Sequence, residues 1–403
     1  MFHSMNKIAS LLVIPAALLL TACPGPFPID PIEPPVAYTI STNITEDTTW
    51  TTGSTFTLNG RIAVEPGVTL TIEPGVVVKG NAGTGANATS LVIAKGAKLM
   101  AVGTPTNPIV FTSVGDNVTP GQIVSPNLDE KFNGLWGGLI ILGDAPISAD
   151  ASSVQIEGIP ASDLNGLYGG SNPNDNSGHL SYISIRHGGA NIGEGNEING
   201  LTLGGVGAGT TIDNIEIIAN QDDGIEFFGG TVDVTNLLVW AAGDDAIDVD
   251  QAYAGTIDNF AVICNGTDHG LEVDGPEGAL NAGQTVKNGT VKGAENAELA
   301  DFRKAAQGDY HNIYFFNFDD CTLNGRGDFS LSSGSDSTFN NGFLTFANLE
   351  VTLVHDSIDM SSMFKGGTHV HATAVLADSN TVGCDASVFS WTAAFAAGEL
   401  NDF

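Results

Sequence analysis

The chain has 403 residues, of which 42% are apolar and only 15% are charged, and it contains 51 glycines. Its 46 acidic residues outnumber its 13 basic residues, so the formal net charge is −33. This charge excludes nucleic acid as a partner and adsorption to anionic lipid, and it favours cations, cationic surfaces or a saline habitat. Abundant glycine without helical periodicity predicts many short strands joined by tight turns.

Residues 1–22 have the layout of a secretory signal peptide. A basic residue precedes an apolar run from Ile8 to Leu20, which is too short to span a membrane. The run ends in "LTAC", which resembles the bacterial lipobox. This resemblance implies cleavage before Cys23 and attachment of lipid to its sulfur. An ordinary signal peptide followed by an unrelated cysteine is the alternative.

Residues 23–36 combine the candidate lipidation site with six prolines, which predict an extended spacer. Pro24, rather than aspartate, follows Cys23, so the usual inner-membrane retention signal of such lipoproteins is missing. We therefore expect an exported protein anchored in the outer membrane of a Gram-negative cell. Its lipid would be its only contact with the membrane.

From Thr55 onward, short β-branched segments alternate with turns. The turn sequence "EPGV" at residues 65–68 recurs at residues 73–76, and "LVIAKGAKLMAVGTPTNPIVFTS" (91–113) continues the pattern. No helix is predicted between these segments to carry the chain across a βαβ sheet. Short strands of this kind predict the coils of a solenoid.

The central segment defines the length of one coil. Residues 211–227, "TIDNIEIIANQDDGIEF", align without a gap with residues 233–249, "DVTNLLVWAAGDDAIDV". A third copy at residues 256–273, "TIDNFAVICNGTDHGLEV", carries one inserted residue. A period of about 22 residues is typical of a β-solenoid, in which each coil buries its inward side chains against its neighbours.

At this point the chain resembles the right-handed parallel β-helices of the pectin-lyase-like superfamily. More specifically, it resembles uncharacterised exported bacterial lipoproteins that share "GLWGGLIILGDAPI" (134–147), "IRHGGANIG" (185–193) and "NQDDGIEFFGG" (220–230). The resemblance implies an all-β, right-handed parallel β-helix over residues 37–340, decorated by loops. It implies last coils and a less regular C-terminal cap over residues 341–403. It brings no established activity.

Each copy of the repeat places carboxylates around two inward apolar residues. Because side chains alternate faces along a strand, Ile225 and Phe227 should point into the core while Glu226 points outward. Equivalent positions in neighbouring coils lie about 4.8 Å apart. We therefore expect one file of Glu226, Asp248 and Glu272, and a second of Asp222, Asp244 and Asp268, with Asp223, Asp245 and His269 beside it and Asp250 and Asp274 extending the cluster.

Like charges at this spacing repel each other by about 1 kcal/mol in water and by more where solvent has little access. Relief can come from protonation, from bonds to backbone N–H groups in the turns, from Arg303 or Lys304 on the next coil, or from a divalent cation. Calcium suits a file of carboxylates better than magnesium does, and zinc is disfavoured because no cysteine or histidine cluster is present. The predicted Ca²⁺ ligands are Asp222, Asp223, Glu226, Asp244, Asp245, Asp248, Asp268 and Glu272.

The order of these motifs is also similar to that of polygalacturonases, which are inverting glycoside hydrolases on this fold. The similarity implies Asp245 as general acid, Asp223 and Asp244 as activators of water, His269 as the residue that tunes the acid, and Arg303 with Lys304 as the uronate clamp. The spacing departs from that family, because Asp268 replaces a glycine before His269 and the two basic residues are adjacent. A Ca²⁺-dependent uronate lyase, with Arg303, Lys304 or Lys292 as base, is the related alternative.

The sequence therefore predicts a lipid-anchored, monomeric β-helix that acts in binding, adhesion or surface structure, with a glycan or an envelope protein as partner. An enzyme acting on acidic polysaccharide is the other class considered. Besides Cys23, the chain contains Cys264, Cys321 and Cys384, an odd number that allows one disulfide or none.

Overall fold

The computed structural model describes residues 36–403 except residues 84 and 194–195. The signal segment (1–22), the candidate lipidation site Cys23 and the spacer up to residue 35 lie outside the described residues. No helix in the described part of the chain is both long enough and apolar enough to cross a membrane.

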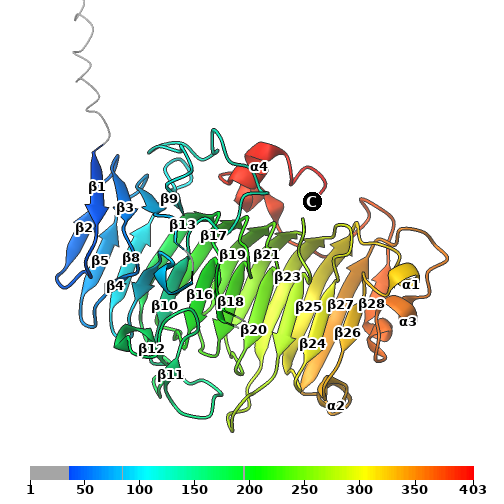
Figure 1. The fold of residues 1–403 in the computed structure, drawn as a ribbon. Helices are drawn as coiled ribbons and strands as arrows, with labels where there is room; N and C mark the ends of the chain where they lie inside the picture. Colours follow the sequence, from blue (N-terminus) through cyan, green and yellow to red (C-terminus); the bar gives the residue numbers. More distant parts are fainter. Residues whose placement is uncertain (1–35, 84, 194–195) are drawn as a thin grey trace, which may run out of the picture. The chain divides into compact units, whose positions relative to one another are not determined.

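The described residues form the right-handed parallel β-helix that the sequence predicts (Figure 1). Two long parallel sheets account for most of its strands. The larger, 15-stranded sheet contains β1 (Ala37–Ile40), β2 (Thr48–Trp50), β3 (Thr55–Leu58), β5 (Thr69–Ile72), β6 (Val77–Gly80), β8 (Lys98–Val102), β9 (Ile109–Ser113), β13 (Gly178–Arg186), β17 (Thr211–Ile218), β19 (Val234–Trp240), β21 (Thr256–Ile263), β23 (Gln284–Lys292), β25 (Gly308–Phe316), β27 (Leu344–Val351) and β28 (Ala372–Ala374).

The second, 9-stranded sheet contains β4 (Ile62–Val64), β7 (Leu91–Ile93), β10 (Leu139–Leu142), β16 (Leu201–Gly204), β18 (Ile225–Phe228), β20 (Ile247–Asp250), β22 (Leu271–Asp274), β24 (Ala300–Arg303) and β26 (Phe329–Leu331). Two small antiparallel pairs are β11 (Val154–Gln155) with β12 (Leu167–Tyr168), and β14 (Ala190–Gly193) with β15 (Asn196–Ile198). The helices are short: α1 (Cys321–Asn324), α2 (Ser335–Asn340), α3 (Met360–Met363), α4 (Ala393–Ala397) and the 3₁₀ turns η1 (Gly85–Asn87), η2 (Leu164–Gly166), η3 (Thr368–His371) and η4 (Ala386–Phe389).

The repeat seen in the sequence sets the register between coils. Ile212 of β17 pairs with Val234 of β19, which pairs in turn with Ile257 of β21. These inward positions are almost fully buried in one continuous core. Because a shift of one residue would turn every inward side chain outward, the apolar pattern permits this alignment alone.

A ladder of asparagines marks the bend within successive strands of the larger sheet. Asn214, Asn236 and Asn259 have φ values of 53°, 57° and 61°, in the left-handed region that asparagine tolerates better than most residues. Asn236 Nδ2 donates to Asn214 Oδ1 at 3.1 Å, and Asn259 Nδ2 donates to Asn236 Oδ1 at 2.7 Å. The same backbone bend is thus repeated coil after coil, and each side chain is bonded to the next.

The loop-rich segment before β13 packs over part of the 9-stranded sheet. Ile156 and Ile159 from this segment join Phe228 in a separate buried cluster. Tyr168 lies in the same cluster, and its hydroxyl donates to Gln251 Oε1 at 3.0 Å. This packing holds the loop that contains Glu157 against the outer face of the sheet.

The C-terminal residues extend the helix and then turn back along its side. β27 and β28 continue the larger sheet, whereas α4 packs on the outer face of β17, β19 and β21, where Ala393 shares a buried cluster with Trp240 (Figure 1). The backbone N–H of Cys384 donates to Thr290 Oγ1 at 2.9 Å, and that of Ala394 donates to Glu216 Oε1 at 3.0 Å. Part of the segment expected as a cap therefore covers a lateral face instead.

Candidate functional site

The first predicted file of acidic side chains lies on the 9-stranded sheet. Glu226 of β18 pairs with Asp248 of β20, and Asp248 pairs with Glu272 of β22. The next position in the file is Asp301 of β24. The inward neighbours Ile225 and Phe227 are fully buried in the core. The prediction that Glu226, Asp248 and Glu272 form one file is therefore confirmed.

The turn that enters these strands carries the second set of carboxylates. Asp223 Oδ1 accepts the backbone N–H of Asp245 at 2.9 Å, and Asp245 Oδ1 accepts the backbone N–H of His269 at 2.9 Å. Asn199 occupies the preceding coil and accepts the backbone N–H of Asp223 at 3.2 Å. One oxygen of each of these aspartates thus stabilises the stacking of turns, as turn aspartates commonly do.

A groove of about 310 Å³ lies over these files. Apart from His269 and Arg303, its lining is acidic: Glu157, Glu197, Asp222, Asp223, Glu226, Asp244, Asp245, Asp248, Asp268 and Glu272. The outward file is not freely solvated, because Glu226, Asp248 and Glu272 are only 6%, 9% and 5% exposed. The groove therefore concentrates negative charge where water has little access, so that repulsion between the carboxylates is weakly screened.

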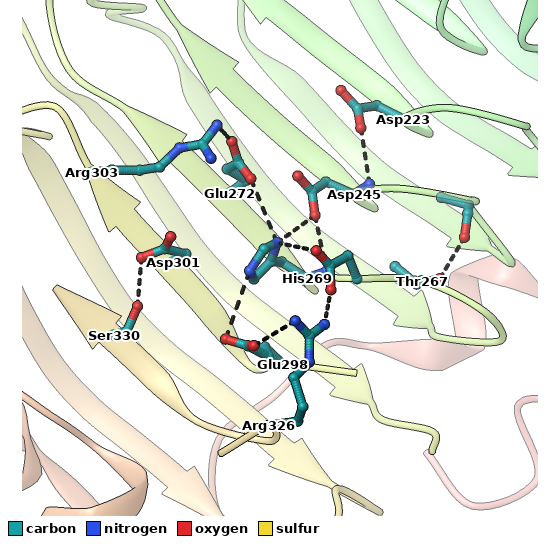
Figure 2. A network of polar contacts seen from close by, with 12 residues as sticks. Asp223, Asp245, Thr267, His269, Glu272, Glu298, Asp301, Arg303, Arg326 and Ser330 are labelled. Atoms are coloured by element: carbon teal, nitrogen blue, oxygen red, sulfur yellow. Dashed lines mark hydrogen bonds and ion pairs between the residues drawn. The ribbon is translucent and has the colours of Figure 1, made fainter. Parts of the chain in front are cut away.

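His269 lies at one end of this acidic groove. Figure 2 shows its ring between Asp245, Glu272 and Glu298. Its Nδ1 lies 2.7 Å from Asp245 Oδ1 and 3.5 Å from Glu272 Oε2, and its Nε2 lies 3.7 Å from Glu298 Oε2. Burial lowers the pKa of His269, but the hydrogen bond to Asp245 and the surrounding carboxylates outweigh it, so that the pKa lies above its usual value.

Basic side chains neutralise the same end of the groove. Arg303 forms ion pairs with Glu272 and, through Nε at 2.7 Å, with Asp274 (Figure 2 shows the first). Lys304 also pairs with Asp274. Arg303 and Lys304 therefore contact Glu272 and Asp274. A uronate clamp would instead lie beside Asp244 and Asp245.

Arg326 is a further cation that the motif comparison did not identify. It pairs with Asp268 and, through Nη1 at 2.8 Å, with Glu298. Glu298 lies two residues before the inward Ala300, just as Asp223 lies two residues before the inward Ile225. The sequence repeat could therefore have identified Glu298 as a member of the site.

The middle of the groove lacks such compensation. Oxygens of Asp223, Glu226 and Asp248 lie within 4.8 Å of one another, and all three residues are buried. Within the described residues, Asp248 Oδ1 is buried without a hydrogen-bond partner. Glu226 does accept a bond from Asn199 Nδ2. Three clustered carboxylates with one unpaired oxygen can hold a hard cation, which takes oxygen ligands of this kind.

The electrostatics of these groups agree with a missing positive charge. Burial, followed by repulsion from neighbouring carboxylates, raises the pKa of Asp223, Glu226 and Asp248 well above the usual range. Burial is also the main cause that raises the pKa of Asp222 to about 8 and that of Glu157 to about 7. Without a cation, several of these groups retain protons near neutral pH.

The structure brings the predicted residues together except for Lys304 and for Lys292, the alternative lyase base, which lies on the larger sheet and pairs with Asp402. Each of the eight predicted Ca²⁺ ligands lines the groove, as do Asp223, Asp244, Asp245, His269 and Arg303 of the predicted catalytic set, whereas Lys304 does not. The sequence pattern did not indicate Glu157 and Glu197, because they come from segments outside the repeat. Cys264, Cys321 and Cys384 are free thiols.

Comparison with known proteins identifies the family. The description "Pectate-lyase like beta helix domain" matches residues 42–396, nearly all of the described chain. The chain matches no curated protein and no solved structure. Because the match extends from the first coils to α4, this protein belongs to the family of pectate-lyase-like β-helix domains.

Proposed function

We propose that this protein binds Ca²⁺ in its acidic groove and that the ion is held by Asp223, Glu226 and Asp248. The observation that carries the proposal is the cluster of these three buried carboxylates, in which Asp248 Oδ1 has no hydrogen-bond partner among the described residues. Calcium takes six to eight oxygen ligands at about 2.3–2.6 Å in flexible geometry, and carboxylates, backbone carbonyls and water can supply them.

Calcium would change what the groove can bind. Ten carboxylates repel any anionic ligand, whereas a bound divalent cation attracts one and lets the remaining carboxylates ionise. In this proposal the loaded groove binds an acidic glycan or an acidic patch of an envelope protein. The lipobox-like "LTAC" and the proline-rich spacer support a place on the outer membrane, anchored through Cys23.

Calorimetric titration with CaCl₂ tests the metal site. We expect the purified protein to bind Ca²⁺, and we expect Glu226→Gln and Asp248→Asn each to weaken binding by about tenfold or more, because each removes a charged ligand. Glu46→Gln is the matched control, because Glu46 is exposed and lies outside the groove. Absence of heat and of any rise in melting temperature with Ca²⁺ would overturn the proposal.

A polysaccharide-degrading enzyme is the second candidate, and the contact between Asp245 and His269 inside the groove favours it. Paired acidic groups with room for water would suit an inverting hydrolase, and a loaded metal site would suit a uronate lyase. Against this candidate, Arg303 and Lys304 are paired with Glu272 and Asp274. Incubation with uronate polymers in the presence of Ca²⁺ separates the two functions. New reducing ends or unsaturated products would show catalysis, and retention of intact polymer would show binding.

A further inference from the structure

A second pocket lies on the larger sheet, where the last coils meet the C-terminal residues. It has a volume of about 350 Å³, and its lining includes the aromatic side chains Tyr314 and Phe316 of β25. Leu353 and Val354, which follow β27, form an apolar wall, and Val354 is 58% exposed. No residue of this pocket belongs to the acidic groove.

The aromatic rings in this pocket are held in a fixed arrangement. Tyr314 and Phe316 are stacked, with centroids 5.3 Å apart and planes inclined by 10°. The ring of Phe403 packs edge-on against Phe316 at 5.6 Å. The Tyr314 hydroxyl lies 2.8 Å from Thr352 Oγ1. Because these contacts fix the rings before any ligand arrives, binding would require little reorganisation.

Two carboxylates complete the lining, Asp378 and Asp402. Asp402 lies 3.0 Å from Lys292 Nζ. Asp378 forms no ion pair within the described part of the chain, and its φ of 59° places it in the left-handed region. Asp378 and Asp402 line the same pocket as Tyr314. Burial raises the pKa of the Tyr314 hydroxyl, the hydrogen bond with Thr352 lowers it, and the charges of Asp378, Glu350 and Asp402 raise it further. The acidic groups and the aromatic rings therefore belong to one site.

We propose that this pocket binds an organic cation, namely an alkylammonium group whose apolar stem packs on Leu353 and Val354. Phe316 and the apolar wall offer apolar surface to the alkyl stem, and a carboxylate without an ion-pair partner supplies the countercharge of the ammonium group. A hydrated inorganic ion would gain little from the apolar wall. A formal net charge of −33 disfavours anionic ligands. The ligand is either a free amine or the side chain of a lysine in a partner protein.

Ligand-detected NMR with n-butylammonium chloride tests the chemistry, with 1-butanol as the neutral counterpart of the same length. The measurement is made with saturating Ca²⁺ so that weak binding in the acidic groove is suppressed. We expect butylammonium to bind and butanol to bind much more weakly. Equal binding of the two probes would overturn the proposal, because the charge would then contribute nothing.

Two variants locate the cation. Asp378→Asn removes the countercharge while keeping a residue that tolerates positive φ, and we expect about threefold weaker binding. Phe316→Ala removes most of the apolar surface that the alkyl stem would contact, and a similar loss is expected. Asp356→Asn is the matched control, because this exposed residue lines a neighbouring pocket but not this one. Affinities unchanged in both variants would contradict the assignment.

A third probe distinguishes the two sources of the ammonium group. The capped tripeptide Ac-Ala-Lys-Ala-NH₂ presents the same charge on a polypeptide. Tighter binding of the tripeptide than of butylammonium supports a lysine side chain of a partner protein. Binding of butylammonium without binding of the tripeptide supports a free amine. Absence of binding by both would refute the proposed site.

Discussion

Asp245 Oδ1 lies 2.7 Å from His269 Nδ1 and 2.9 Å from the backbone nitrogen of the same residue, so one carboxylate oxygen orients both the turn and the ring. Asp268, Glu272 and Glu298 surround the same imidazole. A histidine in this setting acts as an internal cation for the acidic groove. Its charge state therefore links the electrostatics of the groove to pH.

We expect His269 to titrate above the usual histidine pKa of 6.5, because its carboxylate partners stabilise the imidazolium. His187 provides a contrast in the same protein, since burial lowers its pKa. NMR titration of the histidine ring signals measures both. Asp245→Asn should lower the pKa of His269 without moving that of His187. A pKa of His269 at or below 6.5 would show that the carboxylates do not stabilise its charged form.

The stability of the Ca²⁺-free protein should fall as pH rises from about 4 to about 8. The pKa values of Asp222 and Asp250 are raised to about 8 in the folded state, so the folded protein holds protons there that the unfolded chain has lost. The raised pKa of His269 likewise stabilises the folded protein at low pH. This contribution is lost as the pH rises through the pKa that His269 has in the folded state. Urea unfolding at several pH values, with chelator present, measures this trend.

Added Ca²⁺ should reverse most of that fall, because the ion stabilises the ionised carboxylates. Repeating the urea series with Ca²⁺ in place of chelator tests this. Stability that rises with pH in the presence of chelator would show that the groove carboxylates are ionised in the free protein.

Arg303→Met should destabilise the Ca²⁺-free protein by about 2 kcal/mol, because it leaves Glu272 and Asp274 buried without this cation. Lys287→Met removes an ion pair at 3.3 Å whose two side chains are each about a third exposed, and the expected loss is below about 1 kcal/mol. Chemical denaturation compares the two variants. Equal losses would mean that the groove solvates its carboxylates as well as the surface does.

Asn236→Ala should destabilise the fold by about 2 kcal/mol, because it removes two side-chain hydrogen bonds at a residue with φ of 57°. Asn236→Gly removes the same bonds but adopts that φ without strain, so its loss should be smaller. Thermal unfolding ranks the variants. If glycine proves as costly as alanine, the backbone conformation contributes nothing to the asparagine preference.

The repeat makes much of the site predictable from the amino-acid sequence. Because Ile225, Ile247 and Leu271 must share the core, their neighbours Glu226, Asp248 and Glu272 must share the outer face. Glu298 lies one coil after His269 and two residues before Ala300 of β24. Asp223 occupies the same position relative to Ile225 in its own coil.

Other members of the site follow no periodic rule. Glu157 and Glu197 reach the groove from segments whose course depends on tertiary packing, as with Ile156 and Ile159 against Phe228. Likewise, nothing local indicated that the chain after β28 would return along the side of the helix and place Asp402 beside Lys292 and Tyr314. Local sequence carries no information on contacts between segments so far apart.

By itself, the sequence determined the parallel β-helix, its coil length and the stacking of the acidic files, because a period of apolar residues leaves one alignment that buries them all. Only the tertiary structure decided how deeply those carboxylates lie, which cations reach them and which oxygen is left without a partner. These properties depend on loops and on long side chains from other coils, and burial and charge pairing are set by the atoms that surround a group in space rather than by its neighbours along the chain.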